Sequence, residues 1–267
     1  MTADLSLVRS ILFLPASNPR AIDKAREAGA DLVVLDLEDA VKPADKERAR
    51  EAAVEAVASD WPMPVAIRIN GVGTEWHGPD LLAATHCAAD MVVVPRVENK
   101  DELAFVRTQS GKPIAAMVET AKGVLIAPEL TANCAALIAG TNDLRSSLHL
   151  PLDAGRSAIS ASLQLIVLAA RAAGIAVFDG VYNKLDDLVG FAAEAAEGRS
   201  LGFDGKSLIH PSQIESCHRA FAPSEAELAR ARRLVEAFNG GAERFDNEMI
   251  ERMHVVQAER LLARTGG

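Results

Sequence analysis

The chain has 267 residues, of which 49% are hydrophobic and only 4% aromatic, so it can bury a large aliphatic core. This length suits one large domain, since single barrels routinely reach this size. The net charge of −9 argues against a nucleic-acid-binding surface. Any anionic ligand must therefore be met by a local cluster of basic residues.

The N-terminal and cysteine patterns point to a reducing cytoplasm. The first residues contain no basic segment ahead of an apolar run, and no stretch reaches the roughly 18 apolar residues that span a bilayer. Cys87, Cys134 and Cys217 are odd in number and widely spaced, which argues against structural disulfides and zinc sites. We therefore expect a cytoplasmic protein that does not bind membranes.

Eight short apolar runs alternate with helical patterns along the chain. The run at residues 31–39 has five apolar residues without clean alternation and ends in acidic side chains, which is typical of a parallel strand covered on both faces. The predicted strands with their exits are residues 10–15, 31–39, 64–70, 91–98, 114–120, 135–143, 175–182 and 205–212. Because no Gly-x-Gly-x-x-Gly motif follows any strand, the pattern favours a closed α/β barrel of the TIM (β/α)8 type over an open nucleotide-binding sheet.

The helix signals divide the chain into two predicted parts. Ser224 with Glu227 three residues later forms a capping-box pattern, which we assign to the last helix of the barrel. Residues 1–241 are therefore predicted to form the barrel. Residues 242–267 form a charged C-terminal arm with a final helix around residues 254–263, which could pack on a neighbouring subunit.

Basic residues gather around the start of the first predicted helix. Asn18 is its candidate cap and Pro19 follows, while Arg9, Arg20 and Lys24 supply positive charge. A helix N-terminus with such side chains can bind phosphate, because free N–H groups and the helix dipole add to the charge. Taken alone, the same cluster is more often a solvated surface.

Polar residues follow most of the predicted strands, where TIM-barrel chemistry takes place. They are Glu38, Asp39, Arg68, Glu98, Glu119, Asp143 and Asp179. Carboxylates this close repel each other and raise one another's pKa unless a cation is present. Glu119 and Asp143, on successive exits, are two oxygen ligands that leave most of an octahedral Mg²⁺ shell to water and substrate. Any one of these acids could instead be purely structural.

Arg68 lies inside an apolar strand, and a buried cation is costly unless it is paired. We expect its guanidinium to meet a carboxylate from a ligand or from the protein, the latter being a purely structural ion pair. No lysine is well placed for a Schiff base, since Lys206 lies near the start of the eighth strand. The pattern favours metal-stabilised enolate chemistry.

Six stretches carry a family resemblance: residues 9–15, 35–41, 67–70, 94–98, 117–123 and 202–213. In this order they resemble the citrate lyase beta subunit-like branch of the HpcH/HpaI aldolase superfamily, and the resemblance runs from about residue 9 to residue 238. It implies a TIM barrel, commonly a trimer or a dimer of trimers. It also implies Mg²⁺-dependent cleavage or formation of C–C bonds between a 2-oxo acid and an acyl-CoA, with malyl-CoA, citramalyl-CoA or citryl-CoA as substrates.

The resemblance assigns roles to the residues at the barrel mouth. Arg68 would bind the carboxylate of the oxo acid, with Glu119 beside the substrate, and Glu119 and Asp143 would hold Mg²⁺. Glu38 and Asp39 would support the waters of the metal. Arg68 and the metal would then stabilise the enolate that C–C cleavage leaves behind.

The resemblance also assigns roles away from the mouth. Arg20 and Lys24 would meet the phosphates of CoA. Glu251 stands where relatives often have an aspartate in a C-terminal lid, which acts as acid or base in the neighbouring subunit's site. It is therefore a candidate catalytic residue.

Three functions stay open at this point. The first is a hydroxyacyl-CoA lyase, and the second is a malyl-CoA-type thioesterase that uses the same site with water as nucleophile. The third is the beta subunit of a citrate lyase complex, which acts with partner subunits on a substrate carried by an acyl carrier protein. The expected partners are an acyl-CoA, a 2-oxo acid and further copies of the chain.

Overall fold

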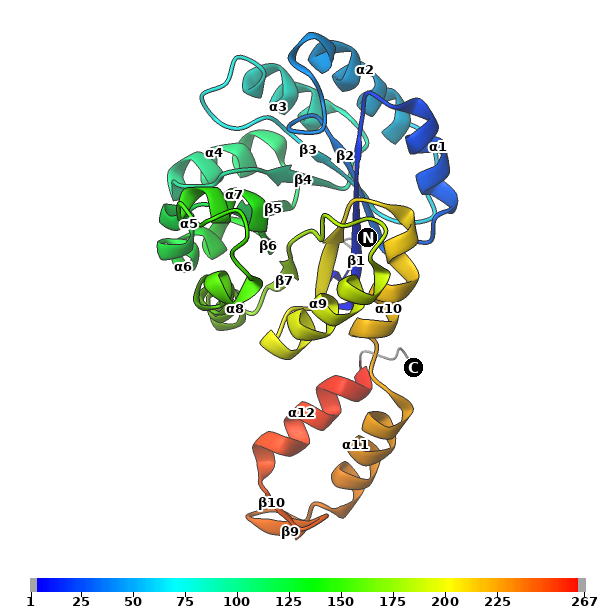
Figure 1. The fold of residues 1–267 in the computed structure, drawn as a ribbon, viewed down its shortest axis with the longest axis vertical. Helices are drawn as coiled ribbons and strands as arrows, with labels where there is room; N and C mark the ends of the chain where they lie inside the picture. The colour runs from blue at the N-terminus through cyan, green and yellow to red at the C-terminus, as the bar shows by residue number, and fades with distance from the viewer. Residues whose placement is uncertain (1–3, 264–267) are drawn as a thin grey trace. The chain divides into compact units, whose positions relative to one another are not determined.

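The computed structural model describes residues 4–263, and within them eight parallel strands close into a barrel in chain order (Figure 1). The strands are β1 (Ser10–Pro15), β2 (Leu32–Asp36), β3 (Val65–Arg68), β4 (Met91–Val94), β5 (Ile114–Val118), β6 (Ala136–Ala139), β7 (Ala176–Asp179) and β8 (Gly205–Leu208). Each pairs with the next, and β8 pairs with β1. The prediction of a (β/α)8 barrel is confirmed.

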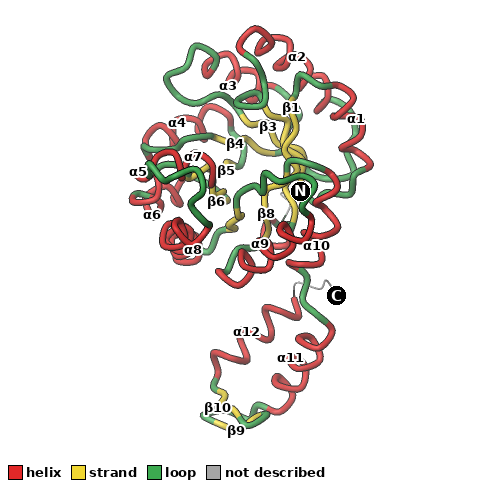
Figure 2. Tube along the Cα trace, viewed as in Figure 1, coloured by secondary structure: helices red, strands yellow, loops and turns green. Residues whose placement is uncertain are grey.

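Helices surround the strands, as Figure 2 shows. They are α1 (Pro19–Glu27), α2 (Lys46–Val57), α3 (His77–His86), α4 (Lys100–Ser110), α5 (Ala121–Leu125), α6 (Ala127–Leu130), α7 (Thr141–Ser147), α8 (Ser160–Ala173), α9 (Leu188–Leu201) and α10 (Ile214–Phe221). The predicted Asn18 cap is confirmed, because its side chain accepts a hydrogen bond from the N–H of Ala21 at 3.2 Å. No helix among the described residues is long and apolar enough to cross a membrane.

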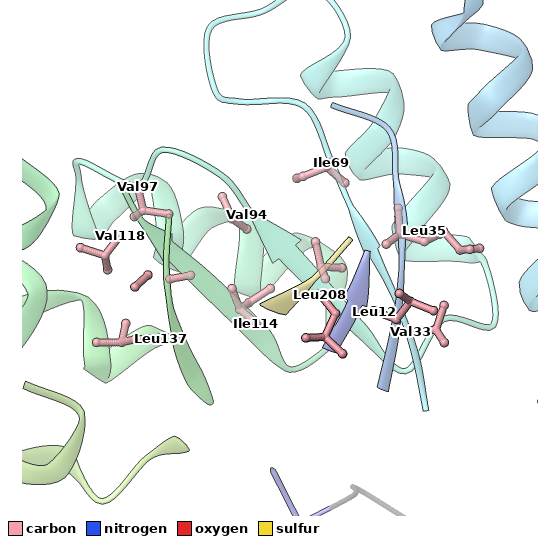
Figure 3. Packing of buried hydrophobic residues seen from close by; sticks show 14 of the residues in the cluster. Leu12, Val33, Leu35, Ile69, Val94, Val97, Ile114, Val118, Leu137 and Leu208 are labelled. Carbon is pink, nitrogen blue, oxygen red and sulfur yellow. The ribbon is translucent and has the colours of Figure 1, made fainter. Parts of the chain in front are cut away.

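Strands β1 to β7 contribute to two apolar layers, because successive side chains point to opposite faces. Leu12, Val33 and Leu35 belong to the outer layer, which packs against the helices (Figure 3). Val34 and Met117 belong to the inner layer, which fills the barrel with strand residues. The last inward positions of the strands determine which polar side chains reach the barrel mouth.

The second part of the chain begins earlier than predicted. The chain divides into two compact units between Phe221 and Ala222, whereas the sequence placed the boundary after residue 241. The capping box at Ser224 is present, but it starts α11 (Glu225–Ala237), which packs against α12 (Arg252–Ala263). The helix after β8 is instead α10, which the sequence analysis missed.

The second unit has its own small core and hairpin. Strands β9 (Glu243–Phe245) and β10 (Glu248–Ile250) pair antiparallel around a turn in which Asp246 and Asn247 both have positive φ. The buried core residues are Ala231, Leu234, Ile250, Val255 and Ala258. They come from both helices and from β10, so α11 finds its apolar partner within this unit.

Asp179, predicted at the barrel mouth, lies in the outer layer instead. It follows inward-facing Phe178 and is fully buried against Arg156 (2.8 Å) and Lys206 (2.9 Å). Lys206 also contacts Glu194 at 2.8 Å. Burial alone would raise the pKa of Asp179, but Lys206 and Arg156 hold it below its usual range. This ionic cluster ties β7 and β8 to α9.

We predict that Lys206→Met lowers the free energy of unfolding by about 3–5 kcal/mol, because it removes one partner from a buried ionic cluster. The change would be measured from the midpoint and slope of urea-induced unfolding. Lys122→Met is the matched control and should change stability by about 0.5 kcal/mol at most. The Lys122 side chain is 65% exposed and lies 3.9 Å from Glu98. Equal losses in the two variants would contradict a stabilising role for the cluster.

Candidate active site at the barrel mouth

A cavity of about 390 Å³ lies at the carboxyl ends of the strands. Its polar lining includes Asp36, Asp39, Arg68, Glu119, Thr141, Asn142, Asp143, Asn183 and Ser207, and Phe13, Met117 and Ile209 are among its apolar residues. No lysine is among the described residues that line this cavity, and carboxylates dominate its charge.

Arg68 is fixed by an acid that the sequence analysis missed. Asp36 and Arg68 are register partners on β2 and β3, and both are buried. Arg68 donates from Nε to Asp36 Oδ1 at 2.7 Å and from Nη2 to Oδ2 at 2.6 Å. Its Nη1 lies 2.9 Å from Glu38 Oε2. The guanidinium thus has a bidentate protein partner on one edge and turns another edge toward the second acid.

Asp36 also orders the loop that carries the predicted acids. Its carboxylate accepts hydrogen bonds from the N–H groups of Glu38 at 2.8 Å and Ala40 at 3.0 Å. Asp39, between them, is exposed and lines the cavity. One side chain therefore positions both Arg68 and this loop. Counting two residues on from inward-facing Val34 would have identified Asp36 from the sequence.

Lys46 also stabilises the loop after β2 that carries Glu38 and Asp39. Its buried ammonium group donates to the backbone oxygens of Leu37 and Glu38 and to Asn70 Oδ1, each at 2.7 Å. Asn70 is in turn fixed by Asp80, whose Oδ2 accepts from Asn70 Nδ2 at 2.6 Å. No feature of the sequence indicated this role, since a lysine in the first turn of a helix is usually solvated.

Glu119 lies just beyond β5, at the next inward position after Met117, and is buried. Its Oε1 accepts a hydrogen bond from the backbone N–H of Arg96 at 2.6 Å. Burial, together with the charges of Glu38 and Asp143, raises the pKa of Glu119 to about 8, although Arg68 and the Arg96 N–H oppose the shift. The ionised form of Glu119 therefore lacks sufficient positive charge around it.

Glu38 has the same shortage of positive charge. Burial raises its pKa to about 7, and the nearby charges of Asp39 and Asp36 add to the shift against the opposing effect of Arg68. Its Oε2 is buried and has no partner in hydrogen-bonding geometry, despite its closeness to Arg68. Two carboxyl groups at the mouth thus favour binding of an additional cation.

Asp143 lies in the first turn of α7, because β6 ends at Ala139 and not at residue 143 as predicted. Its Oδ1 accepts from Arg96 Nη1 at 2.8 Å. Glu119 and Asp143 therefore line one cavity and share one neighbour. A Cβ added at Gly140 would lie only 2.3 Å from Glu119 Oε2, so a glycine is required there for Glu119 to keep its position.

These residues fit a magnesium ion held mostly by water. The described residues include no group of three or more His, Cys, Asp or Glu side chains placed to hold a metal. Mg²⁺ commonly binds through one or two carboxylates and retains several waters, so Glu119 and Asp143 suffice as protein ligands. The raised pKa values of Glu119 and Glu38 indicate the negative potential that a divalent ion would offset.

Several predicted residues lie outside the lining of this cavity: Glu38 and Glu98 line a second cavity, and Asp179 belongs to the outer layer. Arg20 and Lys24 are exposed on α1, whereas Arg9 lies at the opposite end of β1 and pairs with Asp31 at 2.9 Å. The predicted cluster of three basic residues is therefore wrong with respect to Arg9. Glu251 belongs to the second unit, where its N–H donates to His254 Nδ1 at 2.9 Å.

Comparison with known proteins identifies the family. The HpcH/HpaI aldolase/citrate lyase family matches residues 9–211. The chain is 39% identical to a (3S)-malyl-CoA thioesterase of Cereibacter sphaeroides, over 96% of this chain and 94% of that protein. It is 34% identical to the citrate lyase subunit beta of Leuconostoc mesenteroides subsp. cremoris, over 96% of this chain and 92% of the relative.

A solved structure agrees with these matches. The crystal structure of the protein CitE from Mycobacterium tuberculosis, in complex with magnesium, acetoacetate and coenzyme A, is similar with a TM-score of 0.87 and 33% identity. The match covers 97% of this chain and 98% of that one. The resemblance noted from the sequence is thereby confirmed, and the chain belongs to the HpcH/HpaI aldolase/citrate lyase family.

Proposed function

We propose that the protein is a Mg²⁺-dependent carbon–carbon lyase that cleaves a hydroxyacyl-CoA, such as malyl-CoA, citramalyl-CoA or citryl-CoA, into an acyl-CoA and a 2-oxo acid. The observation that carries this proposal is the placement of anchored Arg68 in one cavity with Glu119 and Asp143. A relative that binds magnesium, acetoacetate and coenzyme A together supports the same combination of ligands.

Arg68 provides the fixed positive charge for the oxo acid. Asp36 holds its Nε and Nη2 edge, so a substrate carboxylate would approach the remaining N–H groups on the side of Glu38. The guanidinium also lies against the ring of Phe13, 5.4 Å from its centroid. Because the group is rigid and largely shielded from water, its charge acts without reorganisation when negative charge develops.

The acids at the mouth have separate tasks. Glu119 and Asp143 would hold the magnesium ion, which when bound stabilises negative charge on the enolate oxygen. Cleavage requires loss of a proton from the substrate hydroxyl group and return of a proton to the acyl carbon. Glu38, with a pKa of about 7, lines the neighbouring cavity and would exchange a proton through water that exposed Asp39 orders beside it.

Further residues would complete the site from outside the cavity. Arg20 and Lys24, exposed on α1, would meet the phosphates of CoA. Glu251 would serve as acid or base in the site of a neighbouring copy within a trimer or hexamer. These roles rest on the family resemblance.

Two alternative functions are favoured by named relatives. The 39% identity to a malyl-CoA thioesterase favours hydrolysis, in which water attacks the thioester carbonyl in the same cavity and free CoA is released. The 34% identity to a citrate lyase subunit beta favours action within a complex, on substrate borne by an acyl carrier protein. The products distinguish these alternatives.

The first test is turnover of malyl-CoA and citramalyl-CoA with and without Mg²⁺, following both the 2-oxo acid and free thiol. We expect Mg²⁺-dependent oxo acid without thiol, and a loss of at least about 100-fold in Glu119→Gln, comparable to the removal of a major electrostatic group. Glu129→Gln is the matched control, because Glu129 is exposed on α6 and pairs with Lys100.

Other outcomes of this assay point elsewhere. Thiol release in step with turnover would assign the protein to the thioesterases. Absence of both products, in a protein that still binds Mg²⁺, would favour a carrier-bound substrate, and activity should then appear on addition of the partner subunits.

A second prediction concerns Asp36→Asn, which weakens the anchor of Arg68 and keeps the size of the side chain. We expect kcat/KM to fall about 10–100-fold, the usual cost of removing a group that orients a functional residue. The affinity for Mg²⁺, measured by calorimetry, should change by less than about twofold, because Asp36 contacts neither Glu119 nor Asp143 in the structure. Unchanged kcat/KM would show that Arg68 needs no anchor.

A third prediction concerns Gly140→Ala. The new Cβ would collide with Glu119, so we expect the affinity for Mg²⁺ to fall at least about tenfold, as for other residues that position metal ligands. Gly155→Ala is the control, since its Cβ would meet only Ser157 Oγ at 3.8 Å. Equal titration curves for the two variants would place the metal away from Glu119.

A further inference from the structure

Arg96 contacts both proposed magnesium ligands with different parts of its structure. Its backbone N–H donates to Glu119 Oε1 at 2.6 Å, and its guanidinium donates from Nη1 to Asp143 Oδ1 at 2.8 Å. The side chains of Arg96 and Asp143 are 53% and 35% exposed. A single residue after β4 thus joins two acids, one just beyond β5 and one in α7.

The backbone of Arg96 explains how one residue reaches both acids. Arg96 has φ of +48°, a left-handed conformation that is uncommon for a residue with a side chain. The next residue, Val97, donates a backbone hydrogen bond to the oxygen of Met117 in β5 at 3.2 Å. Arg96 is therefore turned out of the strand direction. The contact with Glu119 needs only its backbone, whereas the contact with Asp143 needs its side chain.

The guanidinium and a magnesium ion would compete for Asp143. Two cations on one carboxylate lie within a few ångströms of each other and repel strongly at the low effective dielectric of a protein cleft. The pair between Arg96 and Asp143 is half exposed and has one hydrogen bond, so it is weak. By contrast, the bidentate pair of Arg68 with Asp36 is buried and stays intact.

We propose that Arg96 is the displaceable counter-ion of the metal site. Its guanidinium neutralises Asp143 while Mg²⁺ is absent and leaves that carboxylate when Mg²⁺ binds. Its backbone N–H keeps Glu119 in place in both states. This inference rests on the proposed function in one respect, namely that Glu119 and Asp143 hold the metal.

The structure provides space for the released side chain. Arg96 also lines a second cavity of about 620 Å³, together with Glu98, Glu102 and Lys122. The carboxylates of Glu98 and Glu102 are new partners for the guanidinium there. Glu98 is only weakly paired, because the ammonium group of Lys122 lies 3.9 Å from its carboxylate.

The exchange would also favour divalent over monovalent ions. A monovalent ion gains less from two carboxylates than a divalent ion does.

Calorimetric titration of Mg²⁺ into the full chain, without substrate, tests this exchange. We expect Arg96→Gln to bind Mg²⁺ about 5–10-fold more tightly than the wild-type chain, because the competing cation is gone while the backbone N–H remains. Arg96→Lys, which keeps the charge, should stay within about threefold of the wild type. Arg48→Gln is the matched control, because Arg48 is 70% exposed and pairs with Asp45 at 2.7 Å, and its affinity should change by less than about twofold.

The outcomes separate this inference from the proposed function. A gain in Arg96→Gln no larger than that of Arg48→Gln, or a loss of affinity, would overturn the exchange and leave the metal site intact. Absence of Mg²⁺ binding in both the wild type and Arg96→Gln, with folding verified by circular dichroism, would overturn the metal site and the exchange together. Arg96→Asn, which tolerates positive φ, replaces Arg96→Gln with the same expectations if the latter does not fold.

Discussion

The bidentate ion pair between Asp36 and Arg68 is the interaction on which the barrel mouth depends. A guanidinium buried among strand residues is costly without a partner, and the register of β2 on β3 places the partner directly beside it. The same carboxylate accepts two N–H groups of the next loop, and so it positions Glu38 as well. Arg68 and the loop that carries Glu38 therefore share one anchor.

Much of the architecture could be predicted from the sequence because strand patterns and exit residues are local. The alternation of side chains would also have identified Asp36 as a residue of the barrel mouth, because Asp36 lies two positions after inward-facing Val34. The same rule would have excluded Asp179, because Asp179 directly follows inward-facing Phe178. The role of Arg96 could not be predicted, because a left-handed turn at a residue other than glycine depends on the contacts around it. Lys46 likewise depends on which loop happens to lie beside its helix.

The C-terminal boundary shows a different limit of sequence reasoning. A capping box at Ser224 identifies where a helix begins but carries no information about its packing partner. The apolar face of α11 suited a barrel as well as it suits α12. The short helix α10 follows directly on a 3-10 turn, Pro211–Gln213, which the side chain of His210 caps. Tertiary contacts determine which of the two helices, α10 or α11, packs on the barrel.

The alternation of side chains along β7 and β8 separates two ionic systems. The cluster of Asp179, Arg156 and Lys206 lies on the helix side of the wall, while the acids of the mouth lie on the lumen side. Since no residue is shared between them, changes in one should combine with changes in the other as independent terms. Substitutions among the acids of the mouth should therefore leave unchanged the stabilisation that the Asp179 cluster contributes to the barrel.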